Sequence, residues 1–212
     1  MATRLIQKNV LVYGLFGFAA FMALAFASQT NGAAKEENTL TGNDAPVAPD
    51  SIGSKKAFQK VYAVLMSPRC MNCHPSGDIP LQGDDSHQHT QGVQRGPDGK
   101  GLYALKCANC HQPQNTPGLH MPPGNPNWHL PPANMKMVFQ GKTPRQLAAQ
   151  LLDPKRNGGK TKQQLIAHVT SDSLVLGGWH PGDGRTLPPL PHDEFARQFK
   201  LWISKGAYLP DK

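Results

Sequence analysis

The sequence predicts a mainly α-helical fold in which short helices are joined by long loops rich in glycine and proline. The chain has 21 glycines and 20 prolines among 212 residues, about a fifth of the total, where average usage gives about 12%. Apolar residues recur at helical spacing in several segments, and no segment alternates like a strand over a convincing length. Loops of such extent usually need something to wrap, and a repeated cysteine motif described below indicates what that is.

The first 53 residues are predicted to precede the folded domain. Residues 1–27 combine a basic start, an uncharged apolar run and a small-x-small pattern at residues 25–27. We expect a signal peptide, which that pattern favours, or an N-terminal membrane anchor, because the apolar residues 10–27 just reach the length of a membrane span. Either way the remaining chain is expected in the periplasm. Residues 28–53 are small and polar and predict a flexible linker, which leaves residues 54–212 as the domain.

The first helix of the domain is predicted over residues 54–66, with Ser54 as its N-cap. Its apolar stripe consists of Phe58, Val61, Tyr62 and Leu65. The pair Ser67-Pro68 ends this helix, immediately before the first cysteine motif.

Two C-x-x-C-H pentapeptides, at residues 70–74 and 107–111, use all four cysteines of the chain. Residues i and i+3 share one face of a helical turn, so two thiols at this spacing can each form a thioether with one vinyl group of a single porphyrin. The histidine that follows can offer a ring nitrogen to the iron. This is the attachment signature of c-type haem. We predict two covalent haems c, held by Cys70, Cys73, Cys107 and Cys110, with His74 and His111 as the proximal ligands.

Two other readings of the cysteines exist. The four thiolates could surround one zinc ion, or they could form disulfides or a redox-active pair in an oxidising compartment. Both readings leave His74 and His111 without a role.

The remaining elements follow in order. Residues 75–98 are predicted as loop, residues 99–108 as a short helix that delivers the second motif, and residues 112–135 as a proline-rich loop. A helix is predicted from Thr143-Pro144 to Asp153-Pro154, and another from Thr161 to about Thr170. Residues 174–191 are again loop, and residues 193–205 are predicted as the last helix, ended by Gly206.

The order of these elements resembles a class I cytochrome c domain: a helix leads into C-x-x-C-H, and a last helix ends in Trp-Ile-x-x-Gly-Ala at residues 202–207. In that family the first and last helices cross and pack beside the haem. The segments 80–85, 93–96, 121–124 and 128–132 resemble a narrower group of small dihaem c-type cytochromes.

Members of that narrower group are often described as the cytochrome subunit of isoquinoline 1-oxidoreductase, a molybdenum hydroxylase. The resemblance covers about residues 55–210 and implies a cytochrome c-like fold wrapped around two haems. It also implies redox protein partners, with a molybdenum hydroxylase as a candidate electron donor. The two motifs are too close in sequence for two complete class I domains, so we expect both haems within one shared fold.

The sixth ligands of the two irons are expected to be imidazole or thioether groups. For the first haem we favour His89, with His87 as its substitute; the alternative is that both lie in a solvated loop. For the second haem the main candidates are Met121, which precedes two prolines, and His168, on the apolar face of a predicted helix where core packing is the alternative. Less favoured candidates are His120, Met135 and His180.

Some residues could serve the haems without binding iron. Candidates to contact the haem propionates are Arg95, Trp128, Trp179 and Arg185, although packing or solvation explains each of them singly. The methionines expected to fill the core are Met66, Met135 and Met137.

Charge and ligand supply narrow the function. The net charge is +8, and removing Arg4 and Lys8 with the export segment still leaves a basic chain, which favours an acidic redox partner. No run of like charge exceeds two residues, so nucleic-acid binding has no support. We expect an electron carrier without independent catalysis, in which both irons have six ligands. The alternative is a haem enzyme or gas-binding protein with one open iron position.

Overall fold

The computed structural model of the chain describes residues 49–212. This part is mainly helical, as the sequence predicts. The helices are α1 (Ser51–Leu65), α2 (Pro68–Met71), α3 (Pro144–Leu152), α4 (Lys162–Ser171), α5 (Ser173–Gly177) and α6 (His192–Ser204). Two antiparallel hairpins pair β1 (Leu81–Gln82) with β2 (His87–Gln88), and β3 (Gly101–Leu102) with β4 (Leu105–Lys106). A 3-10 turn, η1, spans Cys107–Asn109.

The predictions for the N-terminus fall largely outside this part of the chain. The export segment at residues 1–27 and most of the linker at residues 28–53 lie outside the described residues. Within residues 49–212, no helix combines the length and apolar character that crossing a membrane requires.

Helix α1 begins three residues before its predicted start. Asp50 is the N-cap, and its side chain accepts a hydrogen bond from the Gly53 amide at 2.8 Å. Residues 51–53 are therefore helical and not linker, and Ser54 is not the cap. The Ser54 hydroxyl instead donates to the Trp202 carbonyl oxygen at 3.0 Å, which ties α1 to α6.

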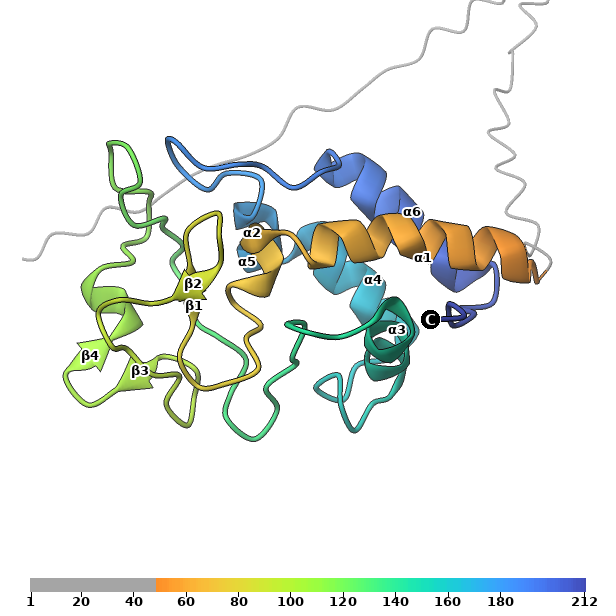
Figure 1. Ribbon diagram of the computed structural model, residues 1–212, viewed down its shortest axis with the longest axis horizontal. Coiled ribbons are helices and arrows are strands. Elements are labelled where there is room, and N and C mark those ends of the chain that lie inside the picture. The colour runs from red at the N-terminus through yellow and green to blue at the C-terminus, as the bar shows by residue number, and fades with distance from the viewer. Residues whose placement is uncertain (1–48) are drawn as a thin grey trace, which may run out of the picture. The chain divides into compact units, whose positions relative to one another are not determined.

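The core lies where α1, α3, α4 and α6 meet (Figure 1). The rings of Phe58 and Trp202 pack with their centres 4.5 Å apart, and Phe199 meets Trp202 edge to face at 5.3 Å. The predicted stripe residues Phe58, Val61 and Leu65 are buried. Burial of these apolar side chains holds the helices together. The packed helices therefore provide the scaffold to which the loops are attached.

Two helix starts have the capping signals that the sequence predicts. Thr143 accepts a hydrogen bond from the Gln146 amide at 3.2 Å, and the Gln146 side chain accepts one from the Thr143 amide at 3.0 Å. Thr161 and Gln164 repeat this reciprocal arrangement at the start of α4. These capping boxes satisfy amide groups that a helix start leaves unpaired.

The helix predicted over residues 99–108 is wrong, because a hairpin and a 3-10 turn occupy this region. Gly99, Gly101 and Tyr103 have φ angles of 79°, 93° and 51°, in the left-handed region that an α-helix of L-residues does not use. A Cβ atom at Gly99 would collide with the Leu130 carbonyl oxygen, so this close approach of two loops requires glycine.

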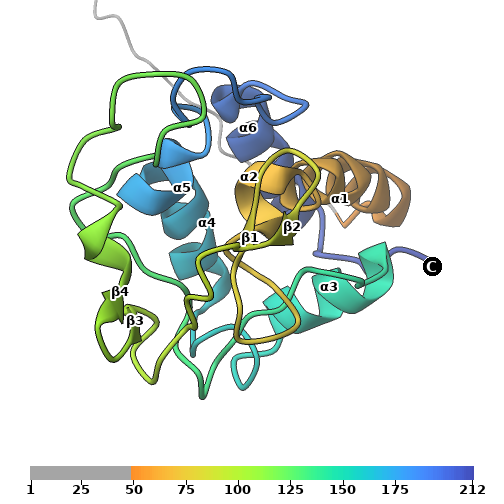
Figure 2. The same cartoon turned by 60° about the vertical axis from the view of Figure 1, so that its left-hand side comes forward.

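The loop predicted over residues 174–191 is correct only in part. Its beginning forms α5, which Asp172 caps by accepting a hydrogen bond from the Leu174 amide at 2.9 Å. Figure 2 shows α2 between α1 on one side and α4 and α5 on the other, with the β1–β2 hairpin next to it. The short helix α2 therefore lies at the junction between the helices and the loop-rich side of the domain.

Candidate haem attachment sites

The first cysteine motif forms a single helical turn. Cys70 lies in α2, where Pro68 occupies the first helical position. The amide of Cys73 donates to the Cys70 carbonyl oxygen at 3.2 Å, and that of His74 donates to the Met71 carbonyl oxygen at 2.9 Å. The two thiols are thus three residues apart on one turn, and the histidine follows directly.

The second motif forms a similar turn, although a hairpin delivers it. The amides of Cys110 and His111 both donate to the Cys107 carbonyl oxygen, at 3.2 and 2.9 Å. A short hairpin therefore leads to the same local arrangement that a long helix produces at the first motif.

Both histidines are held through the same ring atom. The Nδ1 atom of His74 lies 2.7 Å from the Met137 carbonyl oxygen, and that of His111 lies 2.7 Å from the Pro123 carbonyl oxygen. A carbonyl oxygen only accepts, so Nδ1 carries the proton in each ring and Nε2 is the free base. This arrangement fixes the tautomer and the ring orientation that a metal-binding histidine requires.

Each histidine also has an aromatic ring stacked on it. Phe139 lies parallel to His74, with ring centres 3.9 Å apart and planes at 11°. Trp128 lies parallel to His111 at the same distance, with planes at 7°. Burial lowers the pKa of His74 to about 4 and also lowers the pKa of His111. Both rings are therefore neutral at pH 7, which is the form that binds a metal.

Sequence reasoning identified only part of this support. Trp128 was a candidate propionate partner, while its observed contact is with the His111 ring. Phe139 and the carbonyl groups of Met137 and Pro123 were not singled out. The pair Pro122-Pro123 was considered as a support for Met121, and the structure uses the Pro123 carbonyl to hold His111 instead.

The structure does not assemble the four cysteines into a zinc site or into disulfides. All four thiols are free, and residues 49–212 contain no group of three or more His, Cys, Asp or Glu placed to share one ion. Burial raises the pKa of Cys70 to about 12 and that of Cys73 to about 11.

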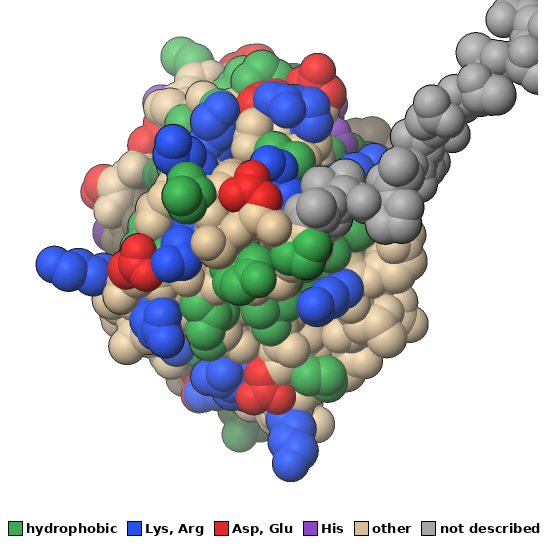
Figure 3. Space-filling view, turned by 90° about the vertical axis from the view of Figure 1, so that its right-hand side faces the viewer, with side chains coloured by type: hydrophobic (Ala, Val, Ile, Leu, Met, Phe, Trp, Pro, Cys, Tyr) green, Lys and Arg blue, Asp and Glu red, His purple; other side chains and the backbone are tan. Residues whose placement is uncertain are grey.

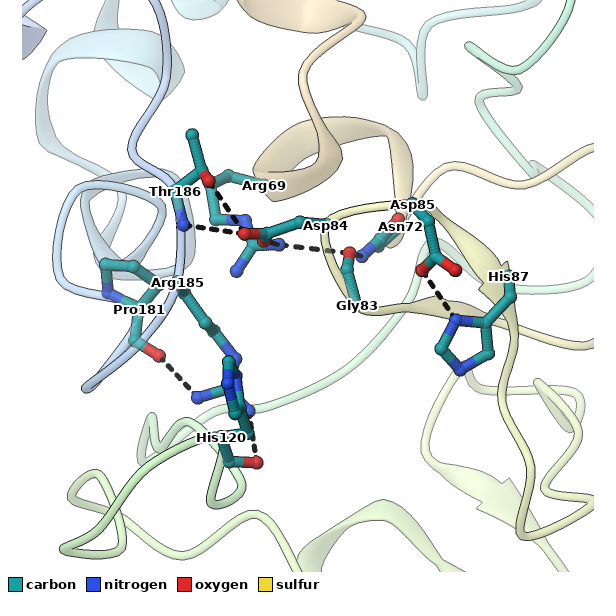
Figure 4. A network of polar contacts seen from close by, with 10 residues as sticks. All are labelled: Arg69, Asn72, Gly83, Asp84, Asp85, His87, His120, Pro181, Arg185 and Thr186. Carbon is teal, nitrogen blue, oxygen red and sulfur yellow. Dashed lines mark hydrogen bonds and ion pairs between the residues drawn. The ribbon is translucent and has the colours of Figure 1, made fainter.

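The ring of His89 lies beside the second motif. Its centre is 6.4 Å from that of His111, with the planes at 65°. The pairing of His89 with the first haem stays a prediction. His87 does not take its place, because it is exposed and its Nδ1 atom lies 2.6 Å from the Asp85 carboxylate (Figure 4).

His168 is close enough to the first motif to affect its histidine. It lies on α4, and its Nδ1 atom is 3.1 Å from the Asp172 carboxylate one turn further along. When His168 is protonated, its charge contributes to lowering the pKa of His74. The prediction that His168 binds the second iron stays a prediction.

The other candidate sixth ligands differ in their exposure and in their local contacts. Met121 is 42% exposed on its loop. The neighbouring His120 is held by its backbone, which donates to the Asp183 carbonyl oxygen at 3.0 Å. His180 is exposed, and the Met135 side chain lies beside Gly158.

Unsatisfied polar atoms gather around the motifs. Six buried side-chain atoms within residues 49–212 have no hydrogen-bond partner: Ser67 Oγ, Arg69 Nε, Asn72 Oδ1, Ser86 Oγ, His89 Nδ1 and Arg95 Nε. Of these, Arg95 Nε has an ion-pair partner, the Asp78 carboxylate at 3.4 Å. All six belong to residues 67–95, from the first motif to the loop that follows it. Buried groups in the helical core are paired, as Gln150 with the Val138 carbonyl oxygen shows. Unpaired buried groups are costly, so their concentration here indicates a missing partner.

A haem c fits this donor set. Arginine N–H groups are good partners for propionate carboxylates, and a neutral histidine nitrogen is a good iron ligand. The arrangement therefore suits a group that carries both carboxylates and a metal. Cys70, Cys73, Cys107 and Cys110 would hold two such groups covalently, and His74 and His111 would bind the irons.

Two arginines are fixed by the loops around the motifs. Arg95 is 1% exposed and donates to the carbonyl oxygens of Pro131 at 2.5 Å and Gly77 at 3.1 Å. Arg185 donates to the carbonyl oxygens of His120 at 2.7 Å and Pro181 at 3.3 Å. The charge of Arg95 contributes to lowering the pKa of His74, and that of Arg185 does so for His111. Arg95 therefore lies near the first motif and Arg185 near the second.

A polar network joins α2 to the loop before α6 (Figure 4). Arg69, the residue before Cys70, contacts the Asp84 carboxylate at 2.6 Å. The same carboxylate accepts hydrogen bonds from the hydroxyl and amide groups of Thr186, at 2.7 and 3.0 Å. These bonds lower the pKa of Asp84. By contrast, the indole N–H of Trp179 donates to the Leu190 carbonyl oxygen at 2.8 Å, so packing explains this tryptophan.

Comparisons with known protein families, with curated proteins and with solved structures found no match.

Proposed function

We propose that the chain is a dihaem c-type cytochrome that carries electrons outside the cytoplasmic membrane, with a cytochrome c-like domain around two covalent haems. The observation that carries this proposal is the repeated construction of the two motifs. In each, two cysteines three residues apart precede a histidine with Nδ1 bonded to a backbone carbonyl and an aromatic ring stacked on its face. A structural zinc site or a disulfide does not require this support of the histidine.

The chain's own residues would perform several tasks in such a carrier. The cysteines would fix the position of each haem, and His74 and His111 would orient the iron through their Nε2 atoms. Arg95 and Arg185 would place positive charge near the two sites. A bound haem supplies one-electron transfer between ferrous and ferric iron.

Partners of opposite charge are part of the proposal. The chain carries 22 Lys and Arg against 14 Asp and Glu, which favours an acidic redox partner. On the face viewed from the right-hand side of Figure 1, the cationic side chains are scattered among acidic and hydrophobic ones (Figure 3). The partner would be a periplasmic dehydrogenase, for which the sequence resemblance suggests a molybdenum hydroxylase, and the acceptor would belong to the respiratory chain. A membrane tether through residues 10–27 would hold the carrier near that acceptor.

The intact mass of the mature protein tests the proposal directly. We expect the mass of the chain plus two haems, without the first 27 residues if the signal peptide is cleaved. Unmodified thiols or a zinc adduct would refute the haem assignment.

Carbon monoxide added to the reduced protein tests the carrier function, because two six-coordinate irons should bind it slowly or not at all. A fast spectral change would instead favour a haem enzyme or gas-binding protein.

A further inference from the structure

The separation of His89 and His111 matches two ligands of one metal ion. Imidazole–metal bonds are about 2 Å long, so two imidazoles on opposite sides of one ion have ring centres about 6 Å apart. The observed separation is 6.4 Å. Stacked rings in this protein, such as His111 and Trp128, have centres 3.9 Å apart, whereas the edge-to-face pair Phe195 and Phe199 has centres 6.3 Å apart. The separation of His89 and His111 therefore fits both an edge-to-face contact and an iron between the rings, and the unpaired Nδ1 atom of His89 favours the iron.

The surroundings of His89 are those of a ligand rather than a solvated loop residue. Its amide donates to the Pro80 carbonyl oxygen at 2.9 Å, immediately after strand β2, which fixes the backbone. Its Nδ1 atom is buried and has no partner within the described residues.

We propose that the loop after the first motif supplies an iron ligand to the second haem. In this arrangement His89 is the sixth ligand of the second iron, opposite His111. This inference rests on the proposed haem function. It leaves Met121, exposed on its own loop, without a role at the second iron.

This ligation would attach one segment of the chain to both haems. The segment begins at His74, the ligand of the first iron, and reaches the second iron through His89. Loss of His89 as a ligand therefore releases this segment as well as one iron position.

Electron paramagnetic resonance of the oxidised dihaem protein tests the pairing. The parent should show two low-spin ferric signals. His89→Ala and His111→Ala should each remove the same signal, and His74→Ala should remove the other. His87→Ala is the matched control, since this side chain is exposed two residues away and contacts Asp85; both signals should persist in it.

Three further measurements keep the test decisive where His111→Ala does not fold. Trp128→Leu should shift the same signal that His89→Ala removes, because Trp128 stacks on His111. Added imidazole should restore the low-spin signal of His89→Ala by filling the vacated position. Met121→Leu should leave both signals unchanged.

The inference is overturned if His89→Ala removes the signal that His74→Ala removes, or leaves both signals intact. Loss of a low-spin signal in Met121→Leu would also overturn it. These outcomes differ from failure of the proposed function, in which the purified protein would contain no covalent haem and show no such signals at all.

Discussion

The imidazole of His111 lies flat against the indole of Trp128, with ring centres 3.9 Å apart and planes at 7°. Together with the hydrogen bond from Nδ1 to the Pro123 carbonyl oxygen, this contact leaves the ring little freedom to rotate. The pair His74 and Phe139 repeats the relationship at the other motif. The two sites therefore share a way of holding a histidine, although the elements that deliver them differ.

Replacing Trp128 with Leu should loosen the second site alone. Without the stacked ring His111 can tilt, so we expect the low-spin signal and the reduction potential of the second haem to change while those of the first remain. Trp128→Phe keeps an aromatic face and should preserve most of the parent behaviour. A spectroscopic redox titration of the three proteins measures this, and equal changes at both haems would contradict it.

Replacing Arg95 with Met should lower the reduction potential of the first haem. Arg95 is buried and its charge acts on His74, and removing a nearby positive charge favours the ferric state by on the order of tens of millivolts. Arg95→Lys keeps the charge and should stay closer to the parent, although it cannot bind both the Pro131 and Gly77 carbonyl groups. A reduction potential of the first haem that rises in Arg95→Met would contradict the expected effect of the Arg95 charge on this iron.

Replacing Asp84 with Asn should weaken the attachment of the loop before α6 to α2. The carboxylate accepts two hydrogen bonds from Thr186 and contacts Arg69, and we expect a loss of about 1 kcal/mol in the free energy of unfolding at pH 7. Asp183→Asn is the control, because that side chain forms no hydrogen bond or ion pair within the described residues and should change little.

The effect of Asp84→Asn should depend on pH in a defined direction. The pKa of Asp84 is lowered in the folded protein by its bonds to Thr186 and by Arg69. Its stabilisation is therefore present above the unfolded pKa of about 4 and is lost as pH falls through the lower folded value. Denaturation curves of parent and variant should converge on acidification, and a gap that widens at low pH would contradict this account.

Replacing Phe58 with Ala should destabilise the whole domain. The side chain is fully buried and packs on Trp202 at 4.5 Å, so truncation should cost about 3–5 kcal/mol. Ile52→Ala, on the same helix but 67% exposed, should change stability by less than about 0.5 kcal/mol. Denaturant titration distinguishes the two, and similar small effects would mean that α1 and α6 are not packed as described.

The local elements could be predicted from the sequence because their signals lie within a few residues of each other. The capping boxes of Thr143 and Thr161 and the apolar stripe of α1 depend on neighbours three or four positions apart. The two cysteine turns follow the same rule. Two local predictions were wrong because another nearby residue determined the structure. Asp50 and not Ser54 is the N-cap of α1. Gly99 and Gly101 have positive φ angles, so a hairpin forms where a helix was predicted.

The sequence by itself determined the mainly helical character, the two C-x-x-C-H turns and the histidines that follow them. Only the tertiary structure decided that the ring of His89 lies next to that of His111, and that Phe139 and Trp128 support the two rings. These relationships join residues far apart in the chain through loops of irregular conformation, in which neither periodicity nor spacing specifies a partner. Their pairing depends on how the loops fold back on the helical core, and this is set by long-range packing and by the need to satisfy buried polar groups.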